Sequence, residues 1–424
     1  MHMEAVASPS PIESACRAGV QADGAVRLTP AQLGDVGAAA ALEVVPMPRG
    51  LALVLPDVSP RKIYVELTTA CDLDCTMCLR RSWGSAGGSM SADTFAALVA
   101  QLSDLPSVRT INLSGYGEPT SHSQFYELLC LVKQAGLSAE VVTNGLRLGG
   151  EAVERLIDLE LDRLVVSVDG IHSSATQRLH AGPFAQVAEN LRRLNRRRLA
   201  RGAACPQVTI EFVATKRNIQ ELPELAGLAR VLGFADILVT NLIPYTPELA
   251  EEILYERYST ASRPRRPSPW NPCVDLPPMD ARSVAGAAVE RLRGAGTHLR
   301  TNGADVAGAG PRCRFITEGR LAVRWDGQVS PCLQLLHTHT YYYRDKPKLS
   351  RSYHVGNVNE TSLPEIWNRP AYRAFRDRVR KFEFSPCIDC GGCDLRETNE
   401  EDCTGKAFPR CGECLWAAGL VQCP

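Results

Sequence analysis

The sequence predicts an α/β protein in which a partial (β/α)6 TIM-like barrel precedes a small cysteine-rich domain. Three observations support this fold class. Short β-rich runs alternate with segments of helical spacing from residue 60 onward, polar motifs follow several of those runs, and cysteine becomes dense from Cys313. Strands separated by single helices imply parallel β–α units. Six such units are fewer than the eight that close a barrel, so we expect an open barrel.

Strands and helices are expected in strict alternation along the barrel. The strands are expected at residues 62–67, 110–115, 139–145, 162–170, 207–215 and 235–243. The helices between them are expected near residues 91–102, 123–135, 150–159, 184–199 and 219–232. At the start of the first helix, Ser91 or Asp93 stands where an N-cap side chain would accept a backbone hydrogen bond.

The composition divides the chain into four parts. Residues 1–58 lack steady periodicity and are interpreted as a partly disordered lead-in. Residues 59–257 hold the barrel, and residues 258–312 form a Pro/Arg/Gly-rich bridge. Residues 313–424 have few apolar runs, so we expect metal clusters rather than a large core to hold this domain together.

The overall charge and hydropathy argue against nucleic-acid and membrane functions. Lys plus Arg and Asp plus Glu number 47 each, so no global field attracts nucleic acid or an anionic membrane. The basic run at 191–202 is interpreted as the solvated face of a helix. No apolar stretch approaches the length needed to span a bilayer, and the N-terminus lacks a secretory pattern. The cytoplasm is therefore the expected compartment.

Cysteine usage favours metal or redox chemistry. The chain has 16 cysteines, and disulfides are typical of small secreted domains rather than of a chain of this size. Cys71, Cys75 and Cys78 lie in one short loop with no fourth cysteine and no histidine beside them. Structural zinc takes four ligands, usually as two separated pairs. Three thiolates on a [4Fe–4S] cube leave one iron open for a small molecule, so the loop predicts an open iron–sulfur cluster.

Polar motifs follow four of the predicted strands. The cysteine loop at 71–78 follows the first strand, and residues 115–119, 143–145 and 167–170 follow the next three. Ligands of parallel α/β sheets sit at the carboxyl ends of the strands. The motifs therefore predict a single active site at this edge.

The cysteine loop and the motifs behind it resemble the radical SAM superfamily. The Cys-x3-Cys-x2-Cys loop after a first strand is the signature of that superfamily. GYGEP resembles its Gly-Gly-Glu-Pro motif, which holds the methionyl amino group of S-adenosylmethionine, although Tyr116 interrupts the glycine pair. SVDG resembles the motif near the ribose and carboxylate, and VTNLIP falls where the sixth strand packs against adenine. The resemblance implies cofactor contacts from Gly115, Gly117, Glu118, Pro119, Ser167, Asp169 and Asn241.

The resemblance also implies the chemistry. The amino and carboxylate groups of S-adenosylmethionine would chelate the open iron, and an electron from the reduced cluster would cleave the sulfonium carbon–sulfur bond. The 5′-deoxyadenosyl radical would then abstract a hydrogen atom from the substrate. The cofactor carries the difficult step, while the protein supplies alignment and excludes water. A low-potential donor such as ferredoxin or flavodoxin would supply the electron.

The C-terminal cysteines resemble a SPASM domain, which carries auxiliary [4Fe–4S] clusters. The opening of that domain is reproduced by Cys313, Gly327 and Cys332, with thirteen and then four residues between them. In SPCIDCGGC, however, two residues follow the second cysteine, where the usual run has five. Nine cysteines exceed the eight that two protein-ligated clusters require, so the spare one stays open. A zinc ribbon of the 387/390 and 411/414 pairs is the alternative. The ligand candidates are Cys313, Cys332, Cys387, Cys390, Cys393, Cys403, Cys411, Cys414 and Cys423.

A narrower likeness covers about residues 60–424. CxxCGGCDLRETNEEDC and FPRCGECLWAAGLVQCP resemble the radical SAM/SPASM maturases associated with tungsten-cofactor oxidoreductases of the aldehyde:ferredoxin type. This likeness implies a role in maturing such an oxidoreductase or its cofactor. The alternative within the same chemistry is modification of a ribosomal peptide or an enzyme side chain. A non-catalytic iron–sulfur electron carrier and a zinc-stabilised scaffold are the alternatives of other classes.

Other polar residues have less certain roles. His337 and His339 could face a substrate or ligate a metal, but hydrogen-bonded surface or interface positions are favoured. Arg80 could raise the potential of the cluster or grip a carboxylate, and solvent exposure is equally compatible with its position.

Overall fold

The computed structural model of the chain describes residues 43–47, 50–54, 59–84, 86–172, 184–255, 273–277, 284–294, 298–301, 313–343, 346–385, 394–405 and 408–424. The chain divides into two compact units, Met1–Val58 and Ser59–Pro424. In the first unit, β1 (Glu43–Met47) and β2 (Gly50–Val54) form an antiparallel hairpin. All further elements belong to the second unit.

A large sheet organises the second unit. Within the described residues its strands follow the order β10-β9-β8-β7-β6-β5-β4-β3-β11-β12-β15. Neighbouring strands from β3 to β10, and the pair β3 and β11, are parallel, whereas β12 and β15 are antiparallel additions. The strand bounds are β3 (Lys62–Val65), β4 (Thr110–Leu113), β5 (Ser138–Thr143), β6 (Arg163–Ser167), β7 (Gln207–Ala214), β8 (Asp236–Asn241), β9 (Cys273–Leu276), β10 (His298–Thr301), β11 (Arg320–Val323), β12 (Gln328–Ser330) and β15 (Gly356–Asn357).

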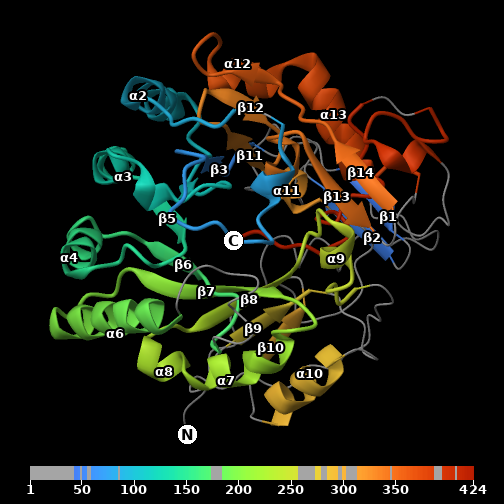
Figure 1. Cartoon of the computed structure of the whole chain (residues 1–424). Coiled ribbons are helices and arrows are strands. Elements are labelled where there is room, and N and C mark those ends of the chain that lie inside the picture. The colour runs from blue at the N-terminus through green and yellow to red at the C-terminus, as the bar shows by residue number, and fades with distance from the viewer. Residues whose placement is uncertain are drawn as a thin grey trace, which may run out of the picture. The chain divides into compact units, whose positions relative to one another are not determined.

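The predicted fold class is confirmed. The six predicted strands are β3 to β8, and they lie side by side in chain order, as β–α units require. Figure 1 shows the sheet curving, with α2, α3, α4 and α6 along its outer side. Two features go beyond the prediction. The region expected to be a bridge contributes β9, β10 and the helix between them, and β11 of the cysteine-rich region pairs with β3.

Some of the described helices begin with a side-chain cap. Ser91 caps α2 by accepting a hydrogen bond from the Thr94 amide, so Ser91 rather than Asp93 is the cap. The bounds are α2 (Ala92–Ala100), α3 (Phe125–Gln134), α4 (Gly150–Asp158), α6 (Phe184–Ala200), α7 (Leu222–Gly227), α8 (Ala229–Leu232), α9 (Pro247–Ala250), α10 (Val284–Gly294), α11 (Arg314–Thr317), α12 (Leu363–Asn368) and α13 (Pro370–Lys381), with short 3-10 turns η1 (Leu79–Ser82), η2 (Gln101–Asp104), η3 (Pro119–Ser121), η4 (Ile219–Glu221), η5 (Leu333–Leu335) and η6 (Asp394–Glu397). A separate hairpin joins β13 (His339–Tyr343) to β14 (Lys346–Ser350).

The core lies between the sheet and its helices. Side chains of the strands such as Ile63, Ile111 and Leu164 are fully buried, and burial of such a side chain contributes about 1.5–3 kcal/mol. The basic run on α6 is neutralised locally, because Arg197 and Arg201 pair with Glu154 on α4. No helix within the described residues is long and apolar enough to cross a membrane.

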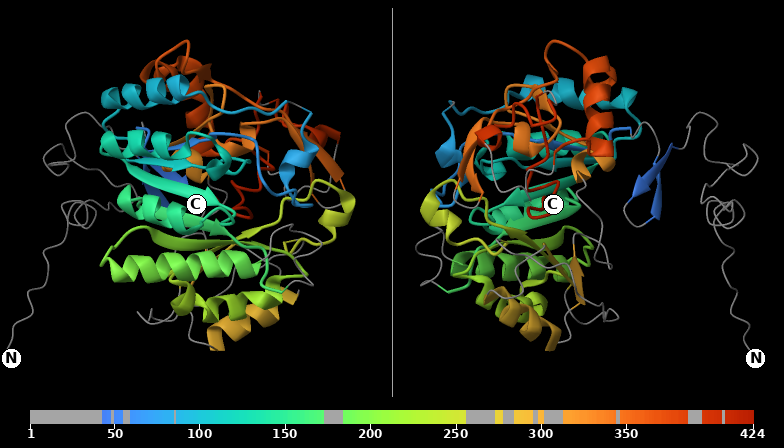
Figure 2. Two further views of the ribbon diagram at one scale, coloured as in Figure 1. Left: turned by 60° about the vertical axis from the view of Figure 1, so that its left-hand side comes forward. Right: turned by 90° about the vertical axis from the view of Figure 1, so that its right-hand side faces the viewer.

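Residues 415–424 run into the centre of the curved sheet, where Figures 1 and 2 mark the end of the chain. The Asn241 amide donates to the Leu420 carbonyl at 2.9 Å, and the Gln422 amide donates to Thr240 Oγ1 at 2.9 Å. Further along, the Pro424 carbonyl accepts from Lys62 Nζ at 3.0 Å and from the Tyr64 hydroxyl. We call residues 415–424 the inner segment.

Candidate active site

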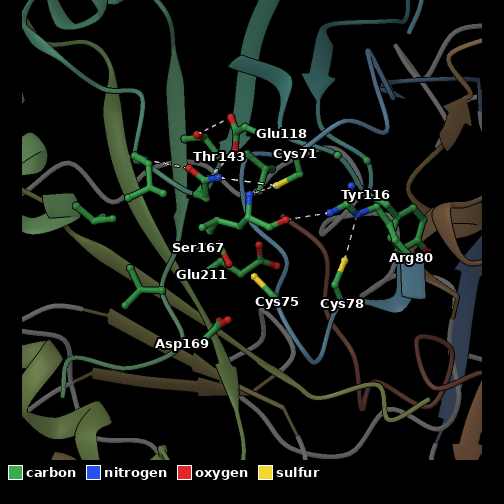
Figure 3. A pocket seen from close by; sticks show the side chains of 18 of the residues that line it. Cys71, Cys75, Cys78, Arg80, Tyr116, Glu118, Thr143, Ser167, Asp169 and Glu211 are labelled. Atoms are coloured by element: carbon green, nitrogen blue, oxygen red, sulfur yellow. Dashed lines mark hydrogen bonds between the residues drawn. The ribbon is translucent and has the colours of Figure 1, made fainter. Parts of the chain in front are cut away.

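A cavity of about 230 Å³ opens at the carboxyl ends of the strands. Its walls come from the cysteine loop after β3 and from the residues that follow β4, β5 and β6, with one side chain of β7 (Figure 3). Four predicted groups of residues therefore meet in one place, as parallel strands require. The predicted site residues that line the cavity are Cys71, Cys75, Cys78, Gly115, Gly117, Glu118, Ser167 and Asp169.

Arg80 holds the cysteine loop in shape. Its Nε donates to Cys78 Sγ at 3.3 Å, and its two terminal nitrogens donate to the carbonyls of Thr69 and Leu73. A guanidinium beside a thiol favours the thiolate, which is the form that binds iron. Burial acts in the opposite direction and raises the pKa of Cys71. A bound cationic cluster would favour the thiolate form, so the loop is suited to hold one.

Asp72 fixes the other side of the loop. Its carboxylate accepts a hydrogen bond from Asn144 Nδ2 at 2.6 Å and pairs with Arg147 at 2.9 Å. Asn144 follows β5, and Asn190 of α6 donates to the neighbouring Gly145 carbonyl at 2.9 Å. The turn after β5 thus positions the cysteine loop, a function that the sequence analysis did not assign to it.

The Glu118 carboxylate is held from four directions. Oε1 accepts hydrogen bonds from the Thr120 amide at 3.0 Å, the Thr120 hydroxyl at 2.6 Å and the Thr143 hydroxyl at 2.8 Å, while Oε2 accepts from the Asn144 amide at 2.8 Å. Burial raises the pKa of Glu118 above its ordinary value, and these hydrogen bonds partly oppose that rise. The carboxylate therefore has a fixed orientation at the cavity wall and can accept from an ammonium donor.

The two glycines of GYGEP exclude a side chain for different steric reasons. A Cβ on Gly117 would lie 2.1 Å from the Thr68 carbonyl oxygen, so the backbone of the cysteine loop excludes any side chain. Gly115 adopts φ +152°, and a Cβ there would lie 2.7 Å from Cγ of Glu66. Between them, Tyr116 points its hydroxyl away to the Leu333 carbonyl at 3.1 Å.

Two further carboxyl side chains, those of Asp169 and Glu211, line the cavity. Asp169 is almost fully buried, and burial together with the Glu211 charge raises its pKa well above the ordinary value. Burial raises the pKa of Glu211 to about 7. The sequence analysis missed Glu211, although a carboxylate inside the apolar strand QVTIEFVA is a usable signal. This wall can exchange a proton near neutral pH.

Two predicted cofactor contacts do not line this cavity. Pro119 is buried at the start of η3, behind Glu118. Asn241 ends β8, and its amide is directed to the Leu420 carbonyl of the inner segment.

A second cavity gathers four of the C-terminal cysteines. Cys313, Cys332, Cys411 and Cys414 line it together with Lys348 and Arg410. Burial raises the pKa of Cys313 to about 12, and it raises those of the other three, with neighbouring thiols adding to the effect at Cys332 and Cys411. Neutral thiols crowded in this way are suited to thiolate binding of a cationic cluster.

The remaining C-terminal candidates lie elsewhere. Cys423 belongs to the inner segment and accepts a hydrogen bond from Trp416 Nε1 at 3.0 Å. Cys403 is exposed and lies 3.2 Å from the Ser385 hydroxyl. Cys387, Cys390 and Cys393 lie outside the described residues, and so does half of the zinc ribbon considered above. Among the described residues, no three His, Cys, Asp or Glu side chains could hold a single metal ion.

His337 and His339 are buried rather than on the surface. His337 Nε2 lies 2.8 Å from the Glu66 carboxylate, and the His337 ring stacks on Trp83 with centroids 3.9 Å apart. His339 Nδ1 lies 2.9 Å from the His337 carbonyl. These contacts join the cysteine-rich region to the end of β3 and to the cysteine loop. Both histidines are therefore hydrogen-bonded, as expected, and they lie at an interface inside the protein.

Comparisons with known proteins agree with this geometry. Residues 65–229 match the radical SAM superfamily, and residues 313–394 match an iron–sulfur cluster-binding domain, SPASM. The chain is 30% identical to the tungsten-containing aldehyde ferredoxin oxidoreductase cofactor-modifying protein of Pyrococcus furiosus, over 85% of this chain and 96% of that protein. It is 24% identical to the PqqA peptide cyclase of Gluconobacter oxydans, over 83% and 88% of the two chains.

Solved structures support the fold. The structure of Streptococcus suis SuiB bound to S-adenosylmethionine superposes with a TM-score of 0.55 at 17% identity, covering 80% of this chain and 72% of SuiB. At this identity the superposition supports the fold alone.

Proposed function

Because the chain belongs to the radical SAM superfamily and carries a SPASM-type iron–sulfur domain, we propose that its first cavity binds a [4Fe–4S] cluster and S-adenosylmethionine side by side. The observation that carries the proposal is the meeting of three cysteines with the GYGEP and SVDG motifs around one cavity. When bound, the cluster supplies the electron that cleaves S-adenosylmethionine into methionine and a 5′-deoxyadenosyl radical.

The residues of the chain then have distinct roles in the proposal. Cys71, Cys75 and Cys78 hold the cluster, and Arg80 keeps their loop folded. The Glu118 carboxylate accepts from the methionyl ammonium, because it is already oriented by the Thr143 hydroxyl and the Asn144 amide. Ser167 and Asp169 contact the far end of the cosubstrate.

The second cavity is proposed as an auxiliary cluster site. Cys313, Cys332, Cys411 and Cys414 supply four thiolates, which completes the ligation of one cube. Cys387, Cys390, Cys393 and Cys403 then remain for a second auxiliary cluster, and Cys423 is the spare cysteine. Four half-buried cysteines lining one cavity support the first of these two assignments.

The proposed biological role is maturation of a tungsten-cofactor oxidoreductase or its cofactor. The identity to the Pyrococcus furiosus cofactor-modifying protein over nearly its whole length supports this role. The proposed partners are that oxidoreductase and a low-potential electron donor such as ferredoxin or flavodoxin. The second candidate is peptide modification, which the similarity to the PqqA peptide cyclase favours.

The core activity is tested by anaerobic reconstitution followed by S-adenosylmethionine and dithionite. We expect release of 5′-deoxyadenosine, and we expect the Cys75→Ala variant to abolish the release. Cys130→Ala is the matched control, because Cys130 lies on α3 and does not line either cavity. Intact S-adenosylmethionine in the wild-type reaction would refute the enzymatic role and favour an electron carrier.

The substrate is tested by co-expression with a tungsten-containing aldehyde ferredoxin oxidoreductase. The wild-type chain and the Cys75→Ala variant are compared, and the extracted cofactor and the oxidoreductase polypeptide are analysed by mass spectrometry. A mass change in the cofactor or the polypeptide that depends on Cys75 supports the maturase role. No change in either, with 5′-deoxyadenosine release intact, would favour the peptide alternative.

A further inference from the structure

Two cations and four thiols line the second cavity. Lys348 of β14 and Arg410 face the same space as Cys313, Cys332, Cys411 and Cys414. The side chain of Lys348 is 6% exposed. An isolated charge buried this deeply costs several kcal/mol unless a partner stabilises it. The structure therefore maintains positive charge beside the cysteines at a cost.

Glu413 is the partner that stabilises this charge, and it does not line the cavity. Its carboxylate lies 2.5 Å from Lys348 Nζ, and it also accepts a hydrogen bond from Arg396 Nε. The carboxylate is 3% exposed. Arg410 Nη2 also lies 3.7 Å from the Glu413 carboxylate, so this single carboxylate faces three cations. A net positive charge therefore remains beside the thiols.

These charges are close enough to the thiols to affect their ionisation. Burial raises the pKa values of Cys411 and Cys414, and the Lys348 ammonium opposes that rise, together with the Arg378 guanidinium at Cys411. Arg320 opposes the rise at Cys313 in the same way. In a site of low effective dielectric constant, such charges stabilise negative charge on the cluster far more than they would in water.

We propose that Lys348, oriented by Glu413, is a positioning residue that raises the reduction potential of the [4Fe–4S] cluster held by Cys313, Cys332, Cys411 and Cys414. The inference rests on the proposed function, because it requires that cluster. Reduction adds one electron from a donor and makes or breaks no bond, so the cluster and its thiolates become more negative by one charge. Nearby positive charge stabilises the reduced form more than the oxidised form, and net charge is one of the factors that set cluster potentials.

The test is a redox titration of the full-length, anaerobically reconstituted protein, with dithionite as the reductant and electron paramagnetic resonance as the readout. Lys348→Met keeps the length and removes the charge, so the midpoint potential of one cluster should fall. Glu413→Gln removes the opposing charge, so the same midpoint should rise. Opposite shifts of the midpoint potential in the two variants indicate an electrostatic role. A structural role would shift the midpoint in the same direction in both.

Two further variants complete the experiment. Lys133→Met removes a lysine that pairs with Asp162 at 2.6 Å on the outer side of the barrel, and it should leave every midpoint unchanged. Cys414→Ala should eliminate the signal of the cluster in question and so identify it. If Lys348→Met fails to assemble that cluster, Lys348→Arg, which keeps the charge, should retain the wild-type midpoint while Glu413→Gln still raises it.

The outcomes separate the two levels of inference. Unshifted midpoints in Lys348→Met and Glu413→Gln, or shifts of the same sign, with all clusters assembled would overturn the role of Lys348 and leave the ligands intact. A Cys414→Ala protein that keeps every cluster signal would instead refute the proposed ligand set.

Discussion

Gly117 shows how a single residue is determined by a neighbouring loop. A Cβ built on Gly117 would lie 2.1 Å from the Thr68 carbonyl oxygen and 2.8 Å from that of Ala70. The next backbone amide, that of Glu118, donates to the Ala70 carbonyl at 2.8 Å. The motif after β4 therefore packs against the backbone that leads into the cysteine loop, in addition to its proposed role as a cosubstrate contact.

We expect Gly117→Ala to impair S-adenosylmethionine cleavage by about 100-fold, because a displacement of roughly 1 Å at reacting groups costs that much. The measurement is the rate of 5′-deoxyadenosine release with saturating dithionite. Gly149→Ala is the control, since a Cβ at Gly149 meets nothing within 4 Å. Wild-type rates in Gly117→Ala would mean that the two loops can separate without functional loss.

Glu211 predicts a pH dependence of stability. Its pKa is raised from 4.5 to about 7 by burial, so the folded protein binds a proton at this carboxyl where the unfolded chain does not. Its stabilising contribution is present below pH 4.5 and is lost as the pH rises to about 7. In thermal melts of the anaerobic protein between pH 5 and 8, Glu211→Gln should flatten this decline and raise the melting temperature at pH 8 by roughly 1–3 °C.

Asp169 sets the limit of that effect. Burial and the Glu211 charge raise its pKa too, so part of the decline with pH should persist in Glu211→Gln. A decline equally steep in both proteins would show that Glu211 is ionised in the folded state throughout this range.

At the scale of elements, strands with apolar runs were predictable and elements defined by distant partners were not. β3 to β8 each carry several buried apolar residues bounded by polar turns, so period and length identify them. β9, α10 and β10 lie in a region whose Pro and Arg content indicates a loop. The pairing of β9 with β8 and of β10 with β9 compensates for that composition. Residues 415–424 carry no local signal at all for their position inside the sheet.

The inner segment changes the interpretation of Asn241. The sequence pattern assigns this residue to the cosubstrate, whereas its amide donates to Leu420. We expect Asn241→Ala to lower the free energy of unfolding by about 1–3 kcal/mol, because a buried carbonyl loses its donor. The apparent KM for S-adenosylmethionine should change little.

Chemical denaturation and the KM measurement together decide this point. Asn368→Ala is the control, because the Asn368 amide donates to Pro364 at an exposed position of α12. A large rise in KM with unchanged stability would restore the role that the sequence pattern predicts.

At the scale of the whole unit, one hydrogen bond connects the two cavities. Tyr116 lines the first cavity, and its hydroxyl donates to the carbonyl of Leu333, which follows Cys332 in the second. Glu66 and His337 add a buried contact beside it at 2.8 Å. The sequence motif treats Tyr116 as an interruption between two glycines. The fold uses it to attach the cysteine-rich region to the barrel.

The same scale explains why the spare cysteine could not be identified from spacing. Cys313 and Cys332 lie far before Cys411 and Cys414 in the chain, with α12 and α13 between them. The four come together in a cavity that residues of α11, α13 and β14 also line. Spacing treats Cys423 as equal to the others. The structure instead places it in the inner segment, where it accepts a hydrogen bond from Trp416.

Iron content therefore discriminates among the cysteines. With three cubes the reconstituted protein should hold about twelve irons, since each cube contributes about four. Cys414→Ala should lose about four of them and keep S-adenosylmethionine binding. Cys423→Ala should retain all of them, because its thiol is outside the four-cysteine cavity. Each variant removes one sulfur atom from the C-terminal region, so unequal iron contents would assign the ligand role to one of the two cysteines and not to the other. Equal losses of iron would return Cys423 to the ligand set and leave one of the other cysteines spare.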